Sequence, residues 1–240
     1  MKYSIIVPVY NRPDEVEELL ESLCSQTLKD FEVIIVEDGS QKPCKDVCDK
    51  YASILDLHYY NKENSGPGQT RNYGVERATG EYVIILDSDV VLPIGYLEAT
   101  EKSLTSPLSS LTSELVAWGG PDASHPSFTP VQKAISYSMT SFFTTGGIRG
   151  GKKKLDKFFP RSFNMGIRRD IYLQLGGFSK MRFGEDVDFL TASLRQAISH
   201  SFSLMHGYGT SVVRTFASSS VRYITVVLPA STWRNATLVR

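Results

Sequence analysis

The sequence predicts an α/β protein with a mostly parallel central sheet flanked by helices. Three observations support this expectation. Apolar, β-branched runs alternate with segments of helical spacing up to about residue 105, and polar residues follow the apolar runs. The composition, with 41% hydrophobic and 22% charged residues in a chain of 240, is that of a globular protein with a sizeable core.

Each expected element rests on its own pattern of apolar residues. Strands are expected at 3–10, 31–36, 54–60 and 82–86, where β-branched and aromatic residues predominate. Helices are expected at 15–25, 44–53 and 69–78, and the first of them places Val16, Leu19 and Leu23 on one face. After residue 105, loops rich in Gly, Pro and Ser predominate. Helical pieces are expected there at 131–140 and 171–175, and the segment 161–169 is either an apolar strand carrying donors or a polar edge strand.

Polar side chains follow three of the expected strands directly. Tyr10-Asn11 follows the first strand, Glu37-Asp38 ends the second, and Asp87-Ser88-Asp89 ends the fourth. Ligands of parallel sheets bind at the carboxyl ends of the strands, so these groups are expected to meet at one site. Two carboxylates one residue apart suit a hard divalent cation that neutralises a diphosphate. Taken singly, each group is also compatible with a solvated turn.

Two further segments carry candidate chemistry. Arg71 follows Gly66-Pro67-Gly68 at the start of a helix, where the helix amino terminus and the guanidinium both favour phosphate, although ordinary capping gives the same pattern. Segment 184–189 places Glu185, Asp186 and Asp188 between apolar residues. Clustered acids disfavour joint ionisation, so one of them is a candidate general base, and a solvated helix start is the alternative.

The bulk properties exclude several classes of protein. A net charge of zero gives no basic footprint for nucleic acid. No apolar run reaches the roughly 18 residues of a membrane span. The four histidines and three cysteines show no convincing metal-ligand spacing. The odd number of cysteines, without a secretory leader, favours a reduced cytoplasmic setting.

Taken together, these motifs resemble family 2 glycosyltransferases of the GT-A type. The matching segments, in the family's order, are 5–12, 36–40, 66–72, 86–89, 164–169, 176–178 and 184–189. Each motif is weak alone, but their order is specific, and the match runs from residue 1 to about residue 189. The resemblance implies a GT-A, Rossmann-like fold and inverting transfer of a sugar from a nucleotide-diphosphate sugar to an acceptor hydroxyl.

The resemblance also implies roles for individual residues. Nucleotide binding is implied for Pro8, Tyr10, Glu37, Asp38, Arg71 and Asp87, with Glu37 standing where the family often has Asp. Asp87 and Asp89 would hold Mn²⁺ or Mg²⁺, and Asp186 would deprotonate the acceptor with Glu185 beside it. A saccharide or lipid-linked acceptor would lie over Gly120, Asp122 and Asn164. Synthesis of a cell-surface polysaccharide or glycolipid follows, in the cytoplasm or at the inner face of the membrane.

The expected organisation has a nucleotide-sugar-binding half at 1–105, an acceptor and catalytic-base half at 106–190, and an atypical tail at 191–240. Family members continue with a Trp-x-His element whose histidine helps to bind the metal, and neither His200 nor His206 occupies its place. Read one base out of register, the codons of residues 205–214 permit Ala-Trp-Val-Trp-His-Lys-Arg-Arg-Thr. Our hypothesis is therefore a one-base frameshift near residues 189–192, with a genuinely divergent tail as the alternative. A shifted tail would be poorly ordered, and codons that forbid the alternative translation would refute the hypothesis.

Three functions follow from these observations. The first is an active inverting glycosyltransferase. The second is a truncated remnant that binds nucleotide without transferring sugar, which the atypical tail motivates. The third, a sugar nucleotidyltransferase, is disfavoured because the first strand is followed by Tyr10-Asn11-Arg12 and not by a Gly-rich loop with Arg and Lys.

Overall fold

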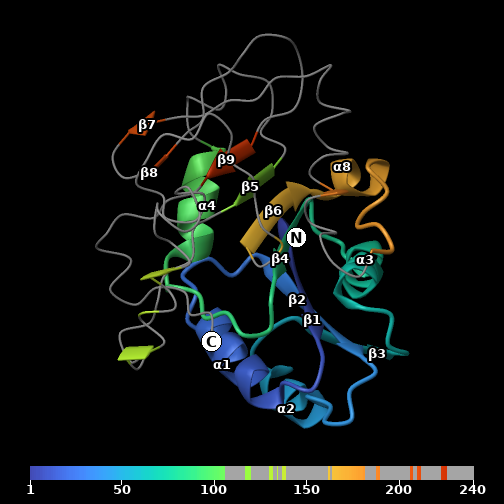
Figure 1. Ribbon diagram of the computed structural model, residues 1–240. Coiled ribbons are helices and arrows are strands. Elements are labelled where there is room, and N and C mark those ends of the chain that lie inside the picture. The colour runs from blue at the N-terminus through green and yellow to red at the C-terminus, as the bar shows by residue number, and fades with distance from the viewer. Residues whose placement is uncertain are drawn as a thin grey trace.

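A seven-stranded sheet forms the centre of the computed structural model (Figure 1). The structure describes residues 1–105, 117–119, 130–131, 134, 137–138, 162, 164–181, 188–189, 206–207, 210–211 and 223–225. The strands, in their order across the sheet, are β3 (Leu57–Lys62), β2 (Phe31–Asp38), β1 (Tyr3–Val9), β4 (Tyr82–Leu86), β6 (Asn164–Arg168), β5 (Ala117–Gly119) and β9 (Tyr223–Thr225). Strands β3, β2, β1 and β4 run parallel, β6 is antiparallel to both of its neighbours, and β9 is parallel to β5. The expected mostly parallel α/β sheet is confirmed.

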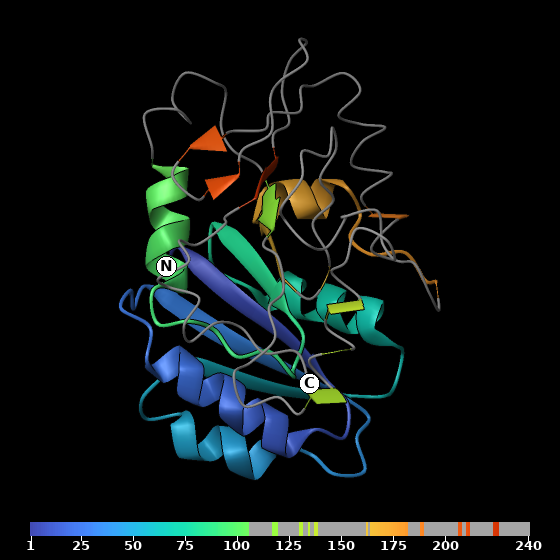
Figure 2. The ribbon, with the colours of Figure 1, turned by 60° about the vertical axis from the view of Figure 1, so that its left-hand side comes forward.

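Helices cover both faces of the sheet (Figure 2). One face carries α1 (Pro13–Cys24), α2 (Lys45–Tyr51) and α4 (Tyr96–Leu104), and the other carries α3 (Pro67–Arg77) and α8 (Arg169–Gln174). Pro13 and Pro67 stand in the first turns of α1 and α3, where the missing N–H of proline costs no helical hydrogen bond. Gly66 precedes α3 at φ 87°, a left-handed conformation that favours glycine.

Alternate residues of each strand feed two separate apolar cores. Ile5 and Val7 pack with Leu19 and Leu23 of α1, whereas Ile6 packs on the opposite face with the α3 and α8 side. These side chains are completely buried in the core of the parallel half. The continuous apolar runs of the sequence therefore reflect strands covered on both faces.

Strand β6 lies inside the sheet, between β4 and β5. The alternative of a polar edge strand is therefore wrong for this segment. Gly166 allows the close approach of β5, because a Cβ at this position would lie 1.9 Å from Cε2 of the buried Trp118 ring. Glycine is required here by packing, and its backbone conformation plays no part.

Several boundaries differ from the expected ones, most clearly at the third strand, and several expectations concern residues that are not described. The third strand begins at Leu57 and not at residue 54, because Ile54 and Leu55 still donate backbone hydrogen bonds to the Tyr51 carbonyl in the turn after α2. Most of the expected helix at 131–140 lies outside the described residues. In the tail, β9 and the pair β7 (His206–Gly207) and β8 (Thr210–Ser211) are described. The rest of 191–240, and with it the expected lack of order, lies outside the described residues.

No helix within the described part of the chain is long and apolar enough to cross a bilayer.

Candidate functional site

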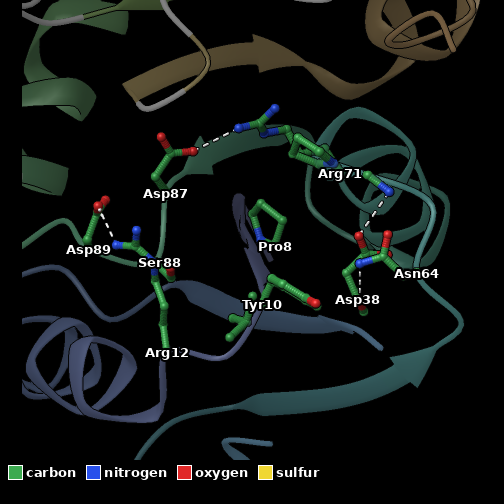
Figure 3. A pocket seen from close by; sticks show the side chains of 12 residues that line it. Pro8, Tyr10, Arg12, Asp38, Asn64, Arg71, Asp87, Ser88 and Asp89 are labelled. Carbon is green, nitrogen blue, oxygen red and sulfur yellow. Dashed lines mark hydrogen bonds and ion pairs between the residues drawn. The ribbon is translucent and has the colours of Figure 1, made fainter. Parts of the chain in front are cut away.

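A cavity of about 470 Å³ opens at the carboxyl ends of β1, β2 and β4 (Figure 3). Three acids and two arginines line the cavity together with smaller polar and apolar residues. The lining residues are Pro8, Val9, Tyr10, Arg12, Asp38, Asn64, Gly66, Pro67, Arg71, Asp87, Ser88 and Asp89. In Figure 3, Asp87 and Asp89 lie on one side of the cavity and Asp38 and Asn64 on the other, with Pro8 and Tyr10 between them. The structure thus brings together Pro8, Tyr10, Asp38, Arg71, Asp87 and Asp89, as the sequence predicted for a common site.

Arg71 forms one wall of the cavity together with Asp87. Arg71 is 4% exposed, and its Nη2 donates a hydrogen bond of 2.8 Å to Asp87 Oδ1. Its guanidinium carbon lies 5.4 Å from the centroid of the Phe178 ring, which is a cation–π distance. A guanidinium held in this way offers a fixed positive group to an anion that enters the cavity.

Asp89 lies beside a second arginine. Arg12 Nη1 donates a hydrogen bond of 2.8 Å to Asp89 Oδ2, and the Asp89 side chain is 14% exposed. Burial, and then the negative charge of Asp87, raise the pKa of Asp89, although Arg12 acts in the opposite direction. Two carboxylates that repel one another in a partly buried site suit a divalent cation, because the cation stabilises both charges.

The described part of the chain offers few ligands to such a cation. Among the residues that the structure describes, no group of three or more His, Cys, Asp and Glu side chains has the arrangement of a metal site. Asp87 and Asp89 are a pair, so a cation bound there would need further oxygen ligands from a diphosphate or from water. The described residues therefore fit a cation that takes part of its coordination from outside this pair.

Asp38 ties the loop between β3 and α3 to the end of β2. Its carboxylate accepts hydrogen bonds from the Ser65 and Gly66 N–H groups, each at 2.9 Å, and it forms an ion pair with Lys62. The Asn64 side chain donates to the Asp38 carbonyl at 2.8 Å. These contacts fix one end of the cavity and hold the amino terminus of α3 toward it.

Glu37 does not line the cavity, contrary to its expected place at the nucleotide. The side chain is completely buried, and Glu37 Oε2 accepts hydrogen bonds from the Cys44 N–H at 2.9 Å and the Tyr59 hydroxyl at 3.2 Å. Glu37 Oε1 accepts from Ser40 Oγ, and Ser40 Oγ in turn accepts from the Asn11 N–H at 2.8 Å. Adjacent strand residues point to opposite faces, so Glu37 and Asp38 cannot both face the cavity. Glu37 braces the loop that carries Tyr10.

Of the residues expected to bind the acceptor or to act as the catalytic base, the structure describes only Asn164. Asn164 is 3% exposed, is absent from the cavity lining, and accepts a 2.6 Å hydrogen bond from the Tyr96 hydroxyl. This bond orients Asn164 toward α4 and makes it part of the packing between sheet and helix. Gly120, Asp122, Glu185 and Asp186 lie outside the described residues.

Sequence reasoning missed four residues that shape the site: Arg12, Asn64, Lys62 and Asn72. Asn72 Oδ1 accepts from the Phe178 N–H at 2.8 Å and from the Tyr172 hydroxyl at 2.6 Å, which fixes the loop under Arg71. Arg12 stands beside the Tyr10-Asn11 turn, and Asn64 begins the loop before Gly66, so proximity to recognised motifs was an available signal. Asn72 lies within the recognised segment 66–72, next to Arg71, so the same signal was available for it, whereas Lys62 had none.

Comparison with known proteins agrees with this arrangement. Residues 4–176 match the sequence family described as "Glycosyl transferase family 2". An uncharacterised glycosyltransferase of Rickettsia felis is 40% identical over 88 residues, which are 37% of this chain and 15% of that protein. The poly(ribitol-phosphate) beta-N-acetylglucosaminyltransferase TarS of Staphylococcus aureus is 40% identical over 93 residues, which are 37% of this chain and 16% of that protein. The chain therefore spans only about a sixth of the length of these relatives.

Solved structures show the same fold. A structure of S. aureus TarS 1–349 in complex with UDP superposes with a TM-score of 0.62 at 22% identity, covering 94% of this chain and 61% of that one. The mannosyltransferase PcManGT of Pyrobaculum calidifontis, in complex with GDP-Man and Mn²⁺, gives a TM-score of 0.56 at 20% identity, covering 95% of this chain and 57% of that one. With most of its length matched by the family and its fold shared with these enzymes, the chain belongs to glycosyl transferase family 2 and has the GT-A fold.

Proposed function

We propose that the cavity binds a nucleotide-diphosphate sugar and that the chain transfers the sugar, with inversion, to an acceptor hydroxyl. The observation that carries the proposal is the convergence of Asp38, Arg71, Asp87 and Asp89 on one cavity at the strand ends. Tyr10 is 52% exposed at the same cavity and offers a ring against which a base can stack. Arg71 lies between the base end and the acidic end, where a diphosphate would pass.

The arginines and the acids exchange partners in this proposal. Arg71 and Arg12 neutralise Asp87 and Asp89 in the structure. When the donor enters, its diphosphate replaces Asp87 as the partner of Arg71, since a guanidinium binds phosphate oxygens in the same geometry as carboxylate. A Mn²⁺ or Mg²⁺ ion held by Asp87 and Asp89 would stabilise the negative charge that develops on the departing nucleoside diphosphate.

Inverting transfer needs a base on the face of the sugar opposite the leaving group. In a single displacement, the acceptor oxygen forms a bond to the anomeric carbon while the bond to the β-phosphate oxygen breaks. The electron pair leaves with the nucleoside diphosphate, and a carboxylate takes the hydroxyl proton. We assign this role to Asp186, with Glu185 beside it, on the sequence resemblance.

The position of Phe189 supports this assignment. Phe189 is 2% exposed, and its ring centroid lies 5.0 Å from that of Phe178, the residue stacked on Arg71. Phe189, which follows Asp186 by three residues in the sequence, therefore lies beside the ring that is stacked on Arg71 at the donor cavity.

Release of nucleoside diphosphate from UDP- and GDP-sugars, with Mn²⁺ and a panel of saccharide and lipid-linked acceptors, tests the proposal. Asp186→Asn should lower kcat by about a hundredfold or more while leaving the affinity for the nucleoside diphosphate unchanged. Asp188→Asn is the matched control, because Asp188 lies in the same segment and is exposed. Nucleotide binding without turnover in the whole panel would instead favour the remnant. The same proposal places the enzyme in cell-surface polysaccharide or glycolipid synthesis, on the cytoplasmic side of the membrane.

A further inference from the structure

We infer that the cavity selects a donor with a uracil-type base, whose ring presents a single imide N–H, and that Lys62 enforces this choice. The inference rests on the proposed donor site and goes on to specify the base. The fold alone does not decide it, because structures that share the fold contain UDP in one case and GDP-Man in another.

The hydrogen bonds of Asp38 carry the inference. A carboxylate has about four acceptor positions, two on each oxygen. Asp38 Oδ1 accepts from Lys62 Nζ and from the Ser65 N–H, so both of its positions are filled. Asp38 Oδ2 accepts from the Gly66 N–H at 2.9 Å. Within the described residues, one acceptor position therefore remains, on Oδ2 of a side chain that lines the cavity.

Lys62 is fixed in this arrangement by the sheet. The β2–β3 register places Lys62 directly beside Asp38. Its ammonium also donates to the Ser65 hydroxyl and to the Glu63 carbonyl, each at 2.7 Å, and only 14% of the Lys62 side chain is exposed. All three donors of the ammonium are thereby used, and Oδ1 stays occupied.

One free acceptor position on Asp38 matches the hydrogen-bonding edge of uracil but not that of guanine or cytosine. The N3–H of uracil is a single donor flanked by two carbonyl oxygens, so it satisfies Oδ2 and leaves no donor behind. The N1–H and N2–H groups of guanine lie side by side and need two acceptors. Filling only one would leave the other donor without an acceptor on Asp38, and a donor that loses its water on binding without gaining a partner costs free energy. Cytosine presents an acceptor at N3, which would face the carboxylate.

Titration calorimetry of the full chain with UDP, GDP and CDP in the presence of Mn²⁺ tests the inference. We expect UDP to bind at least about tenfold more tightly than either other nucleotide, since a polar mismatch in a built site costs at least this much. Lys62→Met frees one position on Oδ1, so that each oxygen of Asp38 then offers one acceptor. This variant should bring the GDP and UDP affinities within about threefold of one another.

Ser65→Ala is the matched control. It removes another contact of Lys62 from the same loop but leaves the Ser65 N–H and the Lys62 ammonium on Oδ1, so the preference for UDP should persist. GDP binding as tightly as UDP to the unmodified chain would overturn the inference and leave the proposed function intact, whether or not the variants fold. An unchanged ratio in folded Lys62→Met would overturn the role of Lys62. No binding of any nucleotide would overturn both the inference and the donor site.

Discussion

Replacing Asn72 with alanine should destabilise the protein, because Asn72 fastens the Phe178 loop to α3. Asn72 Oδ1 accepts from the Phe178 N–H and the Tyr172 hydroxyl, and Asn72 Nδ2 donates to the Phe178 carbonyl at 2.8 Å. Tyr172 and Phe178 are 1% and 2% exposed. Alanine therefore leaves two donors without an acceptor in a largely dry environment, whereas the carbonyl keeps Gln69 Nε2 at 3.0 Å.

The expected loss in the free energy of unfolding follows from the two donors that lose their acceptor. Each buried donor without a partner costs about 1–3 kcal/mol, and the half-buried position of Asn72 lets some water compensate, so we expect a total loss of about 2–4 kcal/mol. Urea unfolding followed by circular dichroism measures it, with an unchanged dependence on urea concentration. Gln69→Ala is the control, because it removes one donor from a carbonyl that keeps Asn72; it should cost less than about 1 kcal/mol. A loss no larger for Asn72→Ala than for Gln69→Ala would show that Asn72 does not hold the Phe178 loop in place.

Three further predictions concern packing, pH and surface charge. Gly166→Ala should cost at least about 2 kcal/mol, seen as a lower melting temperature, because the new Cβ would lie 1.9 Å from the Trp118 ring; an unchanged melting temperature would contradict the packing of β5 on β6. Burial acts to raise the pKa of Glu32, but hydrogen bonds from Ser4 and Thr79 outweigh it and hold that pKa below its usual value. The ionised form therefore stabilises the fold above about pH 4.3 and this stabilisation is lost as the pH falls further, so unfolding of Glu32→Gln should depend less on pH in the acid range than that of the unmodified chain. Equal acid slopes would count against this. Arg12→Ala should change the free energy of unfolding by less than about 1 kcal/mol, because the Arg12 side chain in the pair with Asp89 is 45% exposed; a loss above about 2 kcal/mol in the same assay would show that the pair is structural.

The position of the site could be predicted from the sequence because it depends on local patterns. Buried strands appear as apolar runs, and the residues that follow them must lie at one edge of a parallel sheet. Asp38, Asp87 and Asp89 were located in this way, and the structure places all three on the cavity. The direction of each side chain was less accessible, although the alternation along β2 already implied that Glu37 and Asp38 face opposite ways.

The partners of the site residues could not be predicted, because they come from distant segments. Lys62 reaches Asp38 only through the β2–β3 register, and Phe178 reaches Arg71 across more than a hundred residues of chain. Asn164 likewise accepts a hydrogen bond from the distant Tyr96 hydroxyl of α4. Such pairings depend on how whole elements pack against one another. The periodicity of residues within one segment carries no information about that packing.

On the proposed function, Asp87 and Asp89 mark a donor-diphosphate site that works with a divalent cation. Calorimetric titration of UDP into the unmodified chain and into Asp89→Asn, each with Mn²⁺ and with chelator, tests this role of the two aspartates. We expect Mn²⁺ to tighten UDP binding to the unmodified chain and to the exposed control Asp14→Asn, and to have no such effect on Asp89→Asn. UDP affinity that is independent of Mn²⁺, or an Mn²⁺ effect that survives in Asp89→Asn, would rule out a cation held by these two aspartates.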